Sequence, residues 1–217
     1  MTAGRPRPAF YEIGDVCPEL NKVTAAFPDI RKEAQALVAT RDQMPSYDEL
    51  DNAQSRIAGS TPKKWSVFFL NVFGFKPKMN RERCPQTCAA IEGIPNMLQA
   101  FYSILDPGKS IPEHEGPYLG YLRYHLGLVV PEDNPPSITV NGETHVWSEG
   151  GAILFDDGHP HRVDNESEQV RIVLIIDIRR PMPFFADLVN RVVTSFFARW
   201  TYAYGIYRKI SSEQAVA

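Results

Sequence analysis

Apolar positions along the first third of the chain predict one helix followed by a loop. Between residues 19 and 41 apolar side chains recur every three or four residues, as on the buried face of a helix. The recurring residues are Leu20, Val23, Phe27, Ile30, Ala34 and Leu37.

Residues 46–60 are polar and have no apolar period. We expect them to form a loop, placed over a substrate site. Residues 1–12, with Gly4, Pro6 and Pro8, are predicted to be a loose arm.

The middle of the chain changes to short segments of strand character separated by turn residues. Residues 65–75 are dense in aromatic and β-branched side chains and predict a strand, and residues 84–92 predict a short helix. Further strands are predicted at 99–105, 119–130, 137–140, 143–147, 152–155 and 170–178. Asn141-Gly142 is the strongest hairpin signal among them. This series of short strands predicts an antiparallel jelly roll of the cupin kind with flanking helices.

The last part of the chain predicts a single amphipathic helix. Apolar pairs recur every four residues and polar residues lie between them, which predicts four or five helical turns. The pairs are Phe184/Phe185, Leu188/Val189, Val192/Val193 and Phe196/Phe197, followed by Trp200. We therefore divide a single domain into a helical and loop region (1–60), a β core (61–181) and a C-terminal helix (182–217).

Composition and charge exclude several classes of protein. The 217 residues carry a net charge of −3 and no basic patch interleaved with aromatic residues, which argues against a nucleic-acid partner. Three cysteines are too few for a disulfide framework and fit free thiols in a reducing cytosol. The first residues lack the apolar run of a signal peptide, and no uninterrupted apolar stretch has the length of a membrane span. We expect a cytoplasmic protein, with association to a membrane surface as the alternative.

Two histidines and an arginine have a spacing typical of non-haem Fe(II) oxygenases. His114 is followed after 47 residues by His161, and Arg171 comes ten residues later. The usual layout is His-x-Asp, a distal histidine and then an arginine, so that two imidazoles and one carboxylate hold the iron. Gly116 stands in the place of the aspartate. Either the metal interpretation is wrong or two histidines are sufficient.

Arg171 is unusual because it interrupts a run of apolar residues from 170 to 176. A buried charge is unfavourable unless it binds an anion, and the planar guanidinium suits a carboxylate such as that of 2-oxoglutarate. The alternative for Arg171 is a side chain that faces solvent or pairs with Asp177 or Glu168. The alternative for each histidine is a structural role, which is the more common one for a single histidine. The joint occurrence of five residues favours a site: His114, Arg123, His125, His161 and Arg171.

Residues 60–181 resemble the aspartyl/asparaginyl β-hydroxylase family in motif, order and spacing. The resemblance lies in residues 103–105 with Pro107-Gly108, His114-Glu115-Gly116, residues 122–128, Phe155-Asp156-Asp157 and residues 171–181. The family includes bacterial relatives that hydroxylate the acyl chains of lipid A or ornithine lipids. The resemblance implies a double-stranded β-helix that binds Fe(II) and uses 2-oxoglutarate and O2 as cosubstrates.

The resemblance also implies a role for individual residues. His114 and His161 would be the iron ligands and, with Arg171, the catalytic residues. Arg171 and Ser103 would hold the distal carboxylate of 2-oxoglutarate, and its keto-acid end would contact Arg123 and His125, which share one face of a strand. We expect Asp157 to lie near the metal without being a ligand. His159 is an alternative ligand that the spacing to Arg171 disfavours, and His145 is expected to be structural.

Of two substrate classes, we expect an Asp or Asn side chain, and a lipid acyl chain is the alternative. Gly116 favours an Asp or Asn side chain, in a peptide or as a free amino acid, because peptide-aspartyl hydroxylases of the family also have glycine there, whereas its lipid A hydroxylases keep an aspartate. The C-terminal helix favours a lipid acyl chain at an anionic membrane, because residues 179–209 hold six basic residues against Asp187, with Trp200 and nearby tyrosines. The alternative for this helix, which we favour, is packing on the sheet or on a second subunit as a homodimer. From another class, a non-catalytic cupin-like binding domain would turn over no 2-oxoglutarate.

Overall fold

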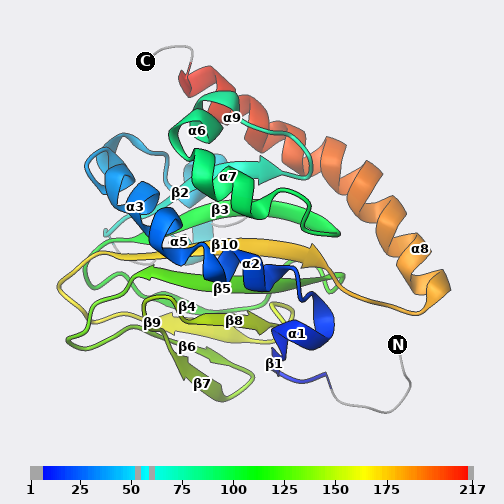
Figure 1. The fold of residues 1–217 in the computed structure, drawn as a ribbon, viewed down its shortest axis with the longest axis horizontal. Helices are drawn as coiled ribbons and strands as arrows, with labels where there is room; N and C mark the ends of the chain where they lie inside the picture. Colours follow the sequence, from blue (N-terminus) through cyan, green and yellow to red (C-terminus); the bar gives the residue numbers. More distant parts are fainter. Residues whose placement is uncertain (1–6, 52–54, 59–61, 215–217) are drawn as a thin grey trace.

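Two antiparallel β-sheets form the frame of the protein, whose computed structural model describes residues 7–51, 55–58 and 62–214 (Figure 1). The larger sheet has the order β1 (Phe10–Tyr11), β8 (Ala152–Phe155), β5 (Tyr121–Val129), β10 (Arg171–Arg179), β3 (Met97–Leu105) and β2 (Trp65–Val72). The smaller sheet has the order β4 (Ile111–His114), β9 (His161–Asp164), β6 (Ser137–Val140) and β7 (Glu143–Val146). The predicted jelly roll with flanking helices is therefore confirmed.

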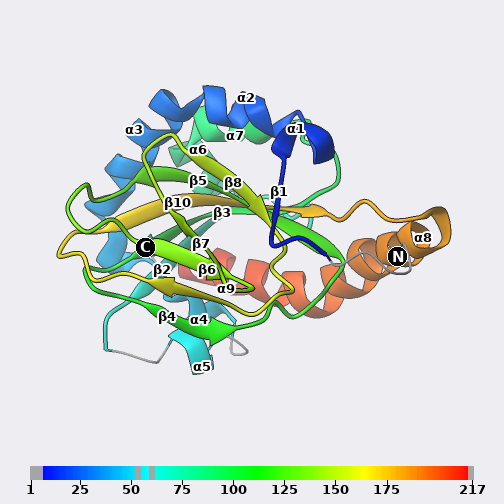
Figure 2. The ribbon, with the colours of Figure 1, turned by 90° about the horizontal axis from the view of Figure 1, so that it is seen from below.

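Both faces of the larger sheet are covered, as alternate residues of its central strand β10 show. Ile172, Leu174 and Ile176 pack into a core with the helices, while Val173 and Ile175 pack into a second core with the smaller sheet. A strand buried on both faces has an apolar run instead of an alternating pattern. Figure 2 shows the helical layer on one face: α1 (Ile13–Val16), α2 (Leu20–Ala25), α3 (Phe27–Val38), α6 (Lys78–Arg83) and α7 (Pro85–Ile91).

The N-terminal predictions need correction in three places. The helix predicted at 19–41 is divided into α2, α3 and a 3-10 turn (Arg41–Gln43), with Pro28 in the first turn of α3, because proline lacks an amide donor for a continuous helix. The loop predicted at 46–60 contains α4 (Tyr47–Leu50) and α5 (Ser55–Ala58), while residues 52–54 and 59–60 lie outside the described residues. Within the predicted arm, β1 pairs with β8, and residues 1–6 lie outside the described residues.

The predicted strands of the β core are present, and two further strands were missed. The predicted 65–75 strand ends at Val72, because Phe73 and Gly74 have φ of 48° and 86°. Asn141-Gly142 forms the predicted hairpin turn between β6 and β7. Strands β4 and β9 were missed, since each has only four residues and polar side chains among them. These two strands hold the two histidines of the predicted site.

The C-terminal helix is longer than predicted and changes its winding along its length. It consists of α8 (Phe184–Val192), two π-helical segments (Val193–Phe197 and Arg199–Ala203) and α9 (Tyr204–Gln214). Ala203, Ile206 and Ile210 pack into the core between the sheets. The α8 end projects beyond the edge of the sheets (Figures 1 and 2). In the described part of the chain no helix has the combined length and apolarity that a membrane span requires.

Candidate functional site

The two predicted histidines are neighbours in the smaller sheet. His114 at the end of β4 lies opposite His161 at the start of β9, and their ring centroids are 4.1 Å apart. Residues directly opposite each other on antiparallel strands point to the same face. The pairing of β4 with β9 therefore brings together two imidazoles that are 47 residues apart in the sequence.

Backbone carbonyls orient both imidazole rings. His114 Nδ1 donates a hydrogen bond of 2.9 Å to the Pro112 carbonyl, and His161 Nδ1 donates one of 2.8 Å to the His159 carbonyl. Each Nε2 atom is then left with a free lone pair, which is the tautomer that binds a metal. Burial, and next the neighbouring His161, lower the pKa of His114 to about 4. The His114 ring is therefore neutral at physiological pH.

Asp157 and Tyr121 fill the space beside Gly116. Asp157 Oδ1 lies 3.4 Å from His161 Nε2, and Tyr121 donates a hydrogen bond to Asp157 Oδ2. A Cβ atom on residue 116 would collide with the Asp157 carboxylate and come within 2.8 Å of Tyr121 Oη. A carboxylate at position 116 would have no room here. Among the described residues no three His, Cys, Asp or Glu side chains are arranged to hold a metal ion.

Arg123 is bound by two buried carboxylates beside the histidines. Its guanidinium lies 2.7 Å from Asp157 Oδ1 and donates two hydrogen bonds to Asp177, of 2.7 and 2.9 Å. Gln99 donates a further hydrogen bond of 2.6 Å to Asp177. Burial by itself would raise the pKa of Asp157, but Arg123, the two histidines and the hydrogen bond from Tyr121 together outweigh it and the pKa is lowered. Arg123, Asp157 and Asp177 therefore form an ion-pair network in which two carboxylates balance the charge of one guanidinium.

Sequence reasoning missed Tyr121 and Asp177. Asp177 lies opposite Arg123 in the register of β10 and β5, so their contact depends on the pairing of two strands far apart in the sequence. The available signal was the acidic residue at the end of the apolar run 172–176, which is as unusual there as Arg171. Tyr121 gave no signal, because a tyrosine at the start of a strand is ordinary.

Arg171 is buried without a carboxylate partner among the described residues. Its guanidinium donates a hydrogen bond of 3.4 Å to Ser103 Oγ and lies 4.4 Å from the centre of the Trp147 ring. Ser103 also accepts a hydrogen bond of 2.9 Å from Trp65. Asp177, one of the two carboxylates considered as partners, binds Arg123 instead. Burial lowers the pKa of Arg171 to about 9, as expected for a cation that lacks a counterion.

Several buried nitrogen atoms around Arg171 have no hydrogen-bond partner among the described residues. They are Nε of Arg171, both ring nitrogens of His125 and Nε1 of Trp147. The His125 ring lies between the rings of Trp147 and Phe155, with centroids 5.8 and 4.9 Å away. Buried polar atoms in native proteins are almost always paired. These orphaned atoms and the arginine charge together fit a small polar anion.

A cavity of about 410 Å³ lies beside His114 and the Arg123 network. One wall is formed by His114 to Tyr118 and the network, and the opposite wall by the C-terminal helix. The helix residues are Val193, Thr194, Phe197, Ala198, Thr201 and Tyr202, and all except Ala198 belong to the two π-helical segments. Tyr47 and Asp51, from the segment predicted to cover a substrate site, also line the cavity. π-Helical segments are frequent at functional sites.

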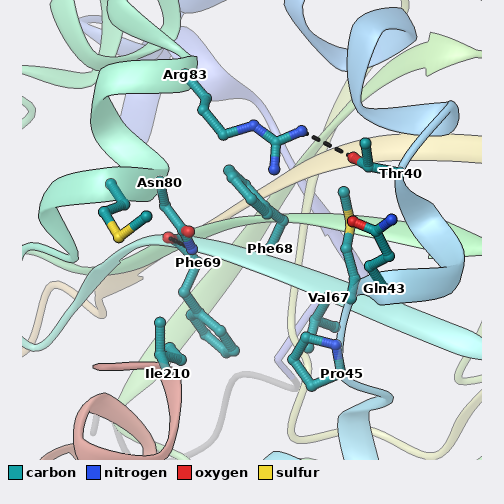
Figure 3. Close-up of a pocket in the computed structure, with 11 residues that line it drawn as sticks. Thr40, Gln43, Pro45, Val67, Phe68, Phe69, Asn80, Arg83 and Ile210 are labelled. Atoms are coloured by element: carbon teal, nitrogen blue, oxygen red, sulfur yellow. Dashed lines mark hydrogen bonds between the residues drawn. The ribbon is translucent and has the colours of Figure 1, made fainter. Parts of the chain in front are cut away.

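A second, smaller cavity of about 190 Å³ lies away from the histidines, at the edge strand β2 (Figure 3). Phe68 and Phe69 form one side of it, and Arg83 donates a hydrogen bond of 2.8 Å to Thr40 across it. The described residues that line this cavity include no His, Cys, Asp or Glu. It therefore lacks the groups that the predicted chemistry needs.

The two remaining histidines considered from the sequence make other contacts. His159 Nε2 donates a hydrogen bond of 3.1 Å to the Arg7 carbonyl and lies 3.8 Å from the Asp156 carboxylate. The His145 ring lies 6.2 Å from the Phe10 ring. Neither residue is among those that line the cavity beside His114.

Comparisons with known proteins agree with the geometry. Residues 24–181 match the aspartyl/asparaginyl β-hydroxylase family. The chain is 39% identical to an ornithine lipid ester-linked acyl 2-hydroxylase of Rhizobium tropici over 76% of its own length and 58% of the relative. It is 35% identical to the aspartyl/asparaginyl β-hydroxylase of Mus musculus over 54% of its length and 16% of the relative. The crystal structure of a Pseudomonas putida prolyl-4-hydroxylase aligns with 72% of the chain and 88% of that structure, at 14% identity and a TM-score of 0.44.

These relatives are longer proteins, since the chain spans 58% and 16% of the two that it matches by sequence. The family match covers well over half of the chain and includes every residue of the histidine and arginine clusters. The chain belongs to the aspartyl/asparaginyl β-hydroxylase family.

Proposed function

We propose that the protein is an Fe(II)- and 2-oxoglutarate-dependent hydroxylase. In this reaction one oxygen atom of O2 is inserted into a C–H bond of the substrate and the other enters succinate, while 2-oxoglutarate loses CO2. The observation that supports the proposal is the pair His114 and His161, whose Nδ1 atoms donate hydrogen bonds to backbone carbonyls and whose Nε2 atoms therefore present lone pairs. When bound, the iron would supply the activation of O2.

The donor set suits Fe(II) held by His114 and His161. Imidazole is a ligand that iron accepts, and a site with two protein ligands leaves positions for cosubstrate and O2. The Asp157 carboxylate, 3.4 Å from His161 Nε2, is bound by Arg123 and Tyr121. We assign Asp157 the role of balancing the charge of Arg123, not that of a third ligand.

The orphaned atoms around Arg171 suit 2-oxoglutarate. We propose that Arg171 and Ser103 bind its distal carboxylate, which would balance a buried charge that no described carboxylate pairs with. His125, with both ring nitrogens unpartnered, would contact the keto-acid end, whereas the contact expected of Arg123 is disfavoured by the two carboxylates that already bind it. The proposal for His125 is supported by its position two residues from Arg123 on β5, which gives the two side chains the same face of the sheet.

The lining of the cavity favours an acyl chain over an Asp or Asn side chain. Arg123 is the sole basic residue among the described residues that line it, and two carboxylates already neutralise it. Asp51 and Glu115 add further acidic groups to the lining, so that a substrate carboxylate would be repelled. Apolar side chains, including Phe73, Leu98, Val193 and Phe197, are available to a hydrocarbon chain. The name of the Rhizobium tropici relative supports this choice.

The test is succinate formation from 2-oxoglutarate, together with product analysis by mass spectrometry. We expect a gain of one oxygen atom in a substrate panel of acyl lipids, Asp and Asn peptides and free amino acids. His161→Ala should abolish succinate formation. His159→Ala is the matched control, because that ring faces the Arg7 carbonyl, and it should retain activity.

Two results would change the proposal. A protein that binds neither Fe(II) nor 2-oxoglutarate would be a non-catalytic binding domain. Hydroxylation of Asp or Asn peptides, with acyl lipids unchanged, would support the proposed reaction type. It would show that the substrate is an Asp or Asn side chain and not an acyl chain.

A further inference from the structure

We infer that the C-terminal helix lies flat on an anionic lipid bilayer and opens the catalytic cavity toward it. The first observation is a concentration of exposed apolar side chains. Of the twelve large hydrophobic residues exposed in the described part of the chain, nine lie between residues 184 and 204. They are Phe184, Phe185, Leu188, Val189, Val192, Phe196, Phe197, Trp200 and Tyr204. Exposed apolar patches of this kind mark interaction sites.

The charge around this apolar face favours an anionic membrane as the partner. Residues 179–214, which include the whole described helix, contain six basic residues and two acidic residues, although the whole chain has a net charge of −3. Arg191 and Arg208 are exposed on the helix itself, and Arg191 forms an ion pair of 2.6 Å with Asp187. A positively charged apolar helix suits anionic headgroups over an acyl layer. Docking of a second copy through the same face would bring two such helices together, with like charges opposing each other.

The outer face of the helix is continuous with the wall of the cavity. Phe197 is 56% exposed and also lines the cavity, so that this side chain lies at the cavity mouth. Val193, one helical turn earlier, lines the cavity next to the exposed Val189 and Val192. An acyl chain leaving the bilayer would therefore meet apolar side chains without a break from the helix surface to the cavity.

The opposite rim of the cavity is fixed to the same helix. Asn190 donates a hydrogen bond of 2.7 Å to the Gly120 carbonyl and accepts one of 3.0 Å from Tyr118 Oη. Tyr118 lines the cavity, and the next residue, Leu119, is 51% exposed. The loop before β5 therefore adds a further exposed apolar side chain at the same edge. Docking of the helix would bring both rims to the membrane.

The test is co-sedimentation of the full chain with vesicles of phosphatidylcholine alone or with added phosphatidylglycerol. We expect binding to the anionic vesicles and at least tenfold weaker binding by Phe184→Ser/Phe185→Ser. These two side chains are 75% and 80% exposed, so their replacement leaves the fold intact. Met79→Ser/Val146→Ser is the matched control on other exposed apolar residues and should bind like the unmodified protein. Arg191→Gln/Arg208→Gln should lose the preference for anionic vesicles.

Three results would overturn the inference. They are no sedimentation of the unmodified protein with anionic vesicles, unchanged binding by Phe184→Ser/Phe185→Ser, and a dimer in solution that this double variant dissociates. The last result would assign the helix face to a second copy. Vesicle binding requires neither iron nor turnover, whereas delivery of an acyl chain to the histidines rests on the proposed function. A protein that binds vesicles but forms no succinate would refute the proposed reaction and leave the docking in place.

Discussion

Introducing the missing carboxylate at position 116 should damage the site instead of completing it. From the sequence pattern alone, Gly116→Asp would restore the usual His-x-Asp arrangement and improve iron binding. In the structure a Cβ atom at this position would collide with the Asp157 carboxylate and lie 2.8 Å from both the Asp157 carbonyl oxygen and Tyr121 Oη. The change must therefore displace Asp157 or the backbone that carries it.

The expected loss of stability depends on what must move to make room, which is the Asp157 carboxylate or the backbone that carries it. Overpacking a closely packed site costs about 1–3 kcal/mol, and this estimate applies to Gly116→Ala, which adds only the Cβ atom. At about 2 kcal/mol, the expected fall in Tm for a domain of this size is about 4–8 °C. Gly116→Asp also adds a negative charge beside Asp157 and disturbs its ion pair with Arg123, so its loss of stability should be larger.

Thermal unfolding followed by circular dichroism measures both variants, and Fe(II) affinity is measured alongside. Gly205→Ala is the matched control, because its Cβ atom would meet nothing within 4 Å and glycine is a poor helix residue. We expect it to unfold at or above the temperature of the unmodified protein. The reasoning is refuted if Gly116→Ala unfolds no earlier than the unmodified protein, or if Gly116→Asp keeps its Tm and binds Fe(II) more tightly.

Three further predictions concern buried groups. Arg171→Gln should raise the 2-oxoglutarate concentration for half-maximal succinate formation at least tenfold, and an unchanged value would exclude Arg171 from the cosubstrate site. Asp177→Asn should lower the free energy of unfolding, measured in urea, by about 3–5 kcal/mol, because it removes one of the carboxylates that bind the buried Arg123. Asp164→Asn, the control in an exposed ion pair, should lower it by under about 1 kcal/mol. Burial raises the pKa of Cys17 to about 11 and that of Cys84 to about 12. A thiol reagent at pH 8 should therefore label neither cysteine until denaturant is added. Rapid labelling of either one in the native protein would contradict this.

The β core could be predicted because its signals are local. An apolar run such as 172–176 requires a strand covered on both faces, and Asn141-Gly142 requires a tight turn, whatever the rest of the chain does. The burial of Arg171 was predictable because it lies in the same apolar run, although the residues it contacts, Ser103 and Trp147, are distant in the sequence.

The composition of the ion-pair network could not be predicted, because it depends on the register of distant strands. Arg123 meets Asp177 through the pairing of β5 with β10, and it meets Asp157 through a loop that precedes β9. Strands β4 and β9 are too short to show a period, so the contact between His114 and His161 was expected from their spacing to Arg171 and from family resemblance, and not from strand periodicity. Local sequence contains no information on such registers.

Gly116 is a weaker guide to the substrate than the sequence suggests. Asp157 already holds a carboxylate next to the histidine pair, and Arg123 and Tyr121 keep that carboxylate in the space that a residue 116 side chain would need. Glycine at 116 is thus explained by packing, with either class of substrate. The residues that can select a substrate are those of the opposite wall, which come from the C-terminal helix. Because that wall presents Val193 and Phe197 and continues to the exposed face of the same helix, substrate choice and membrane contact are properties of one element.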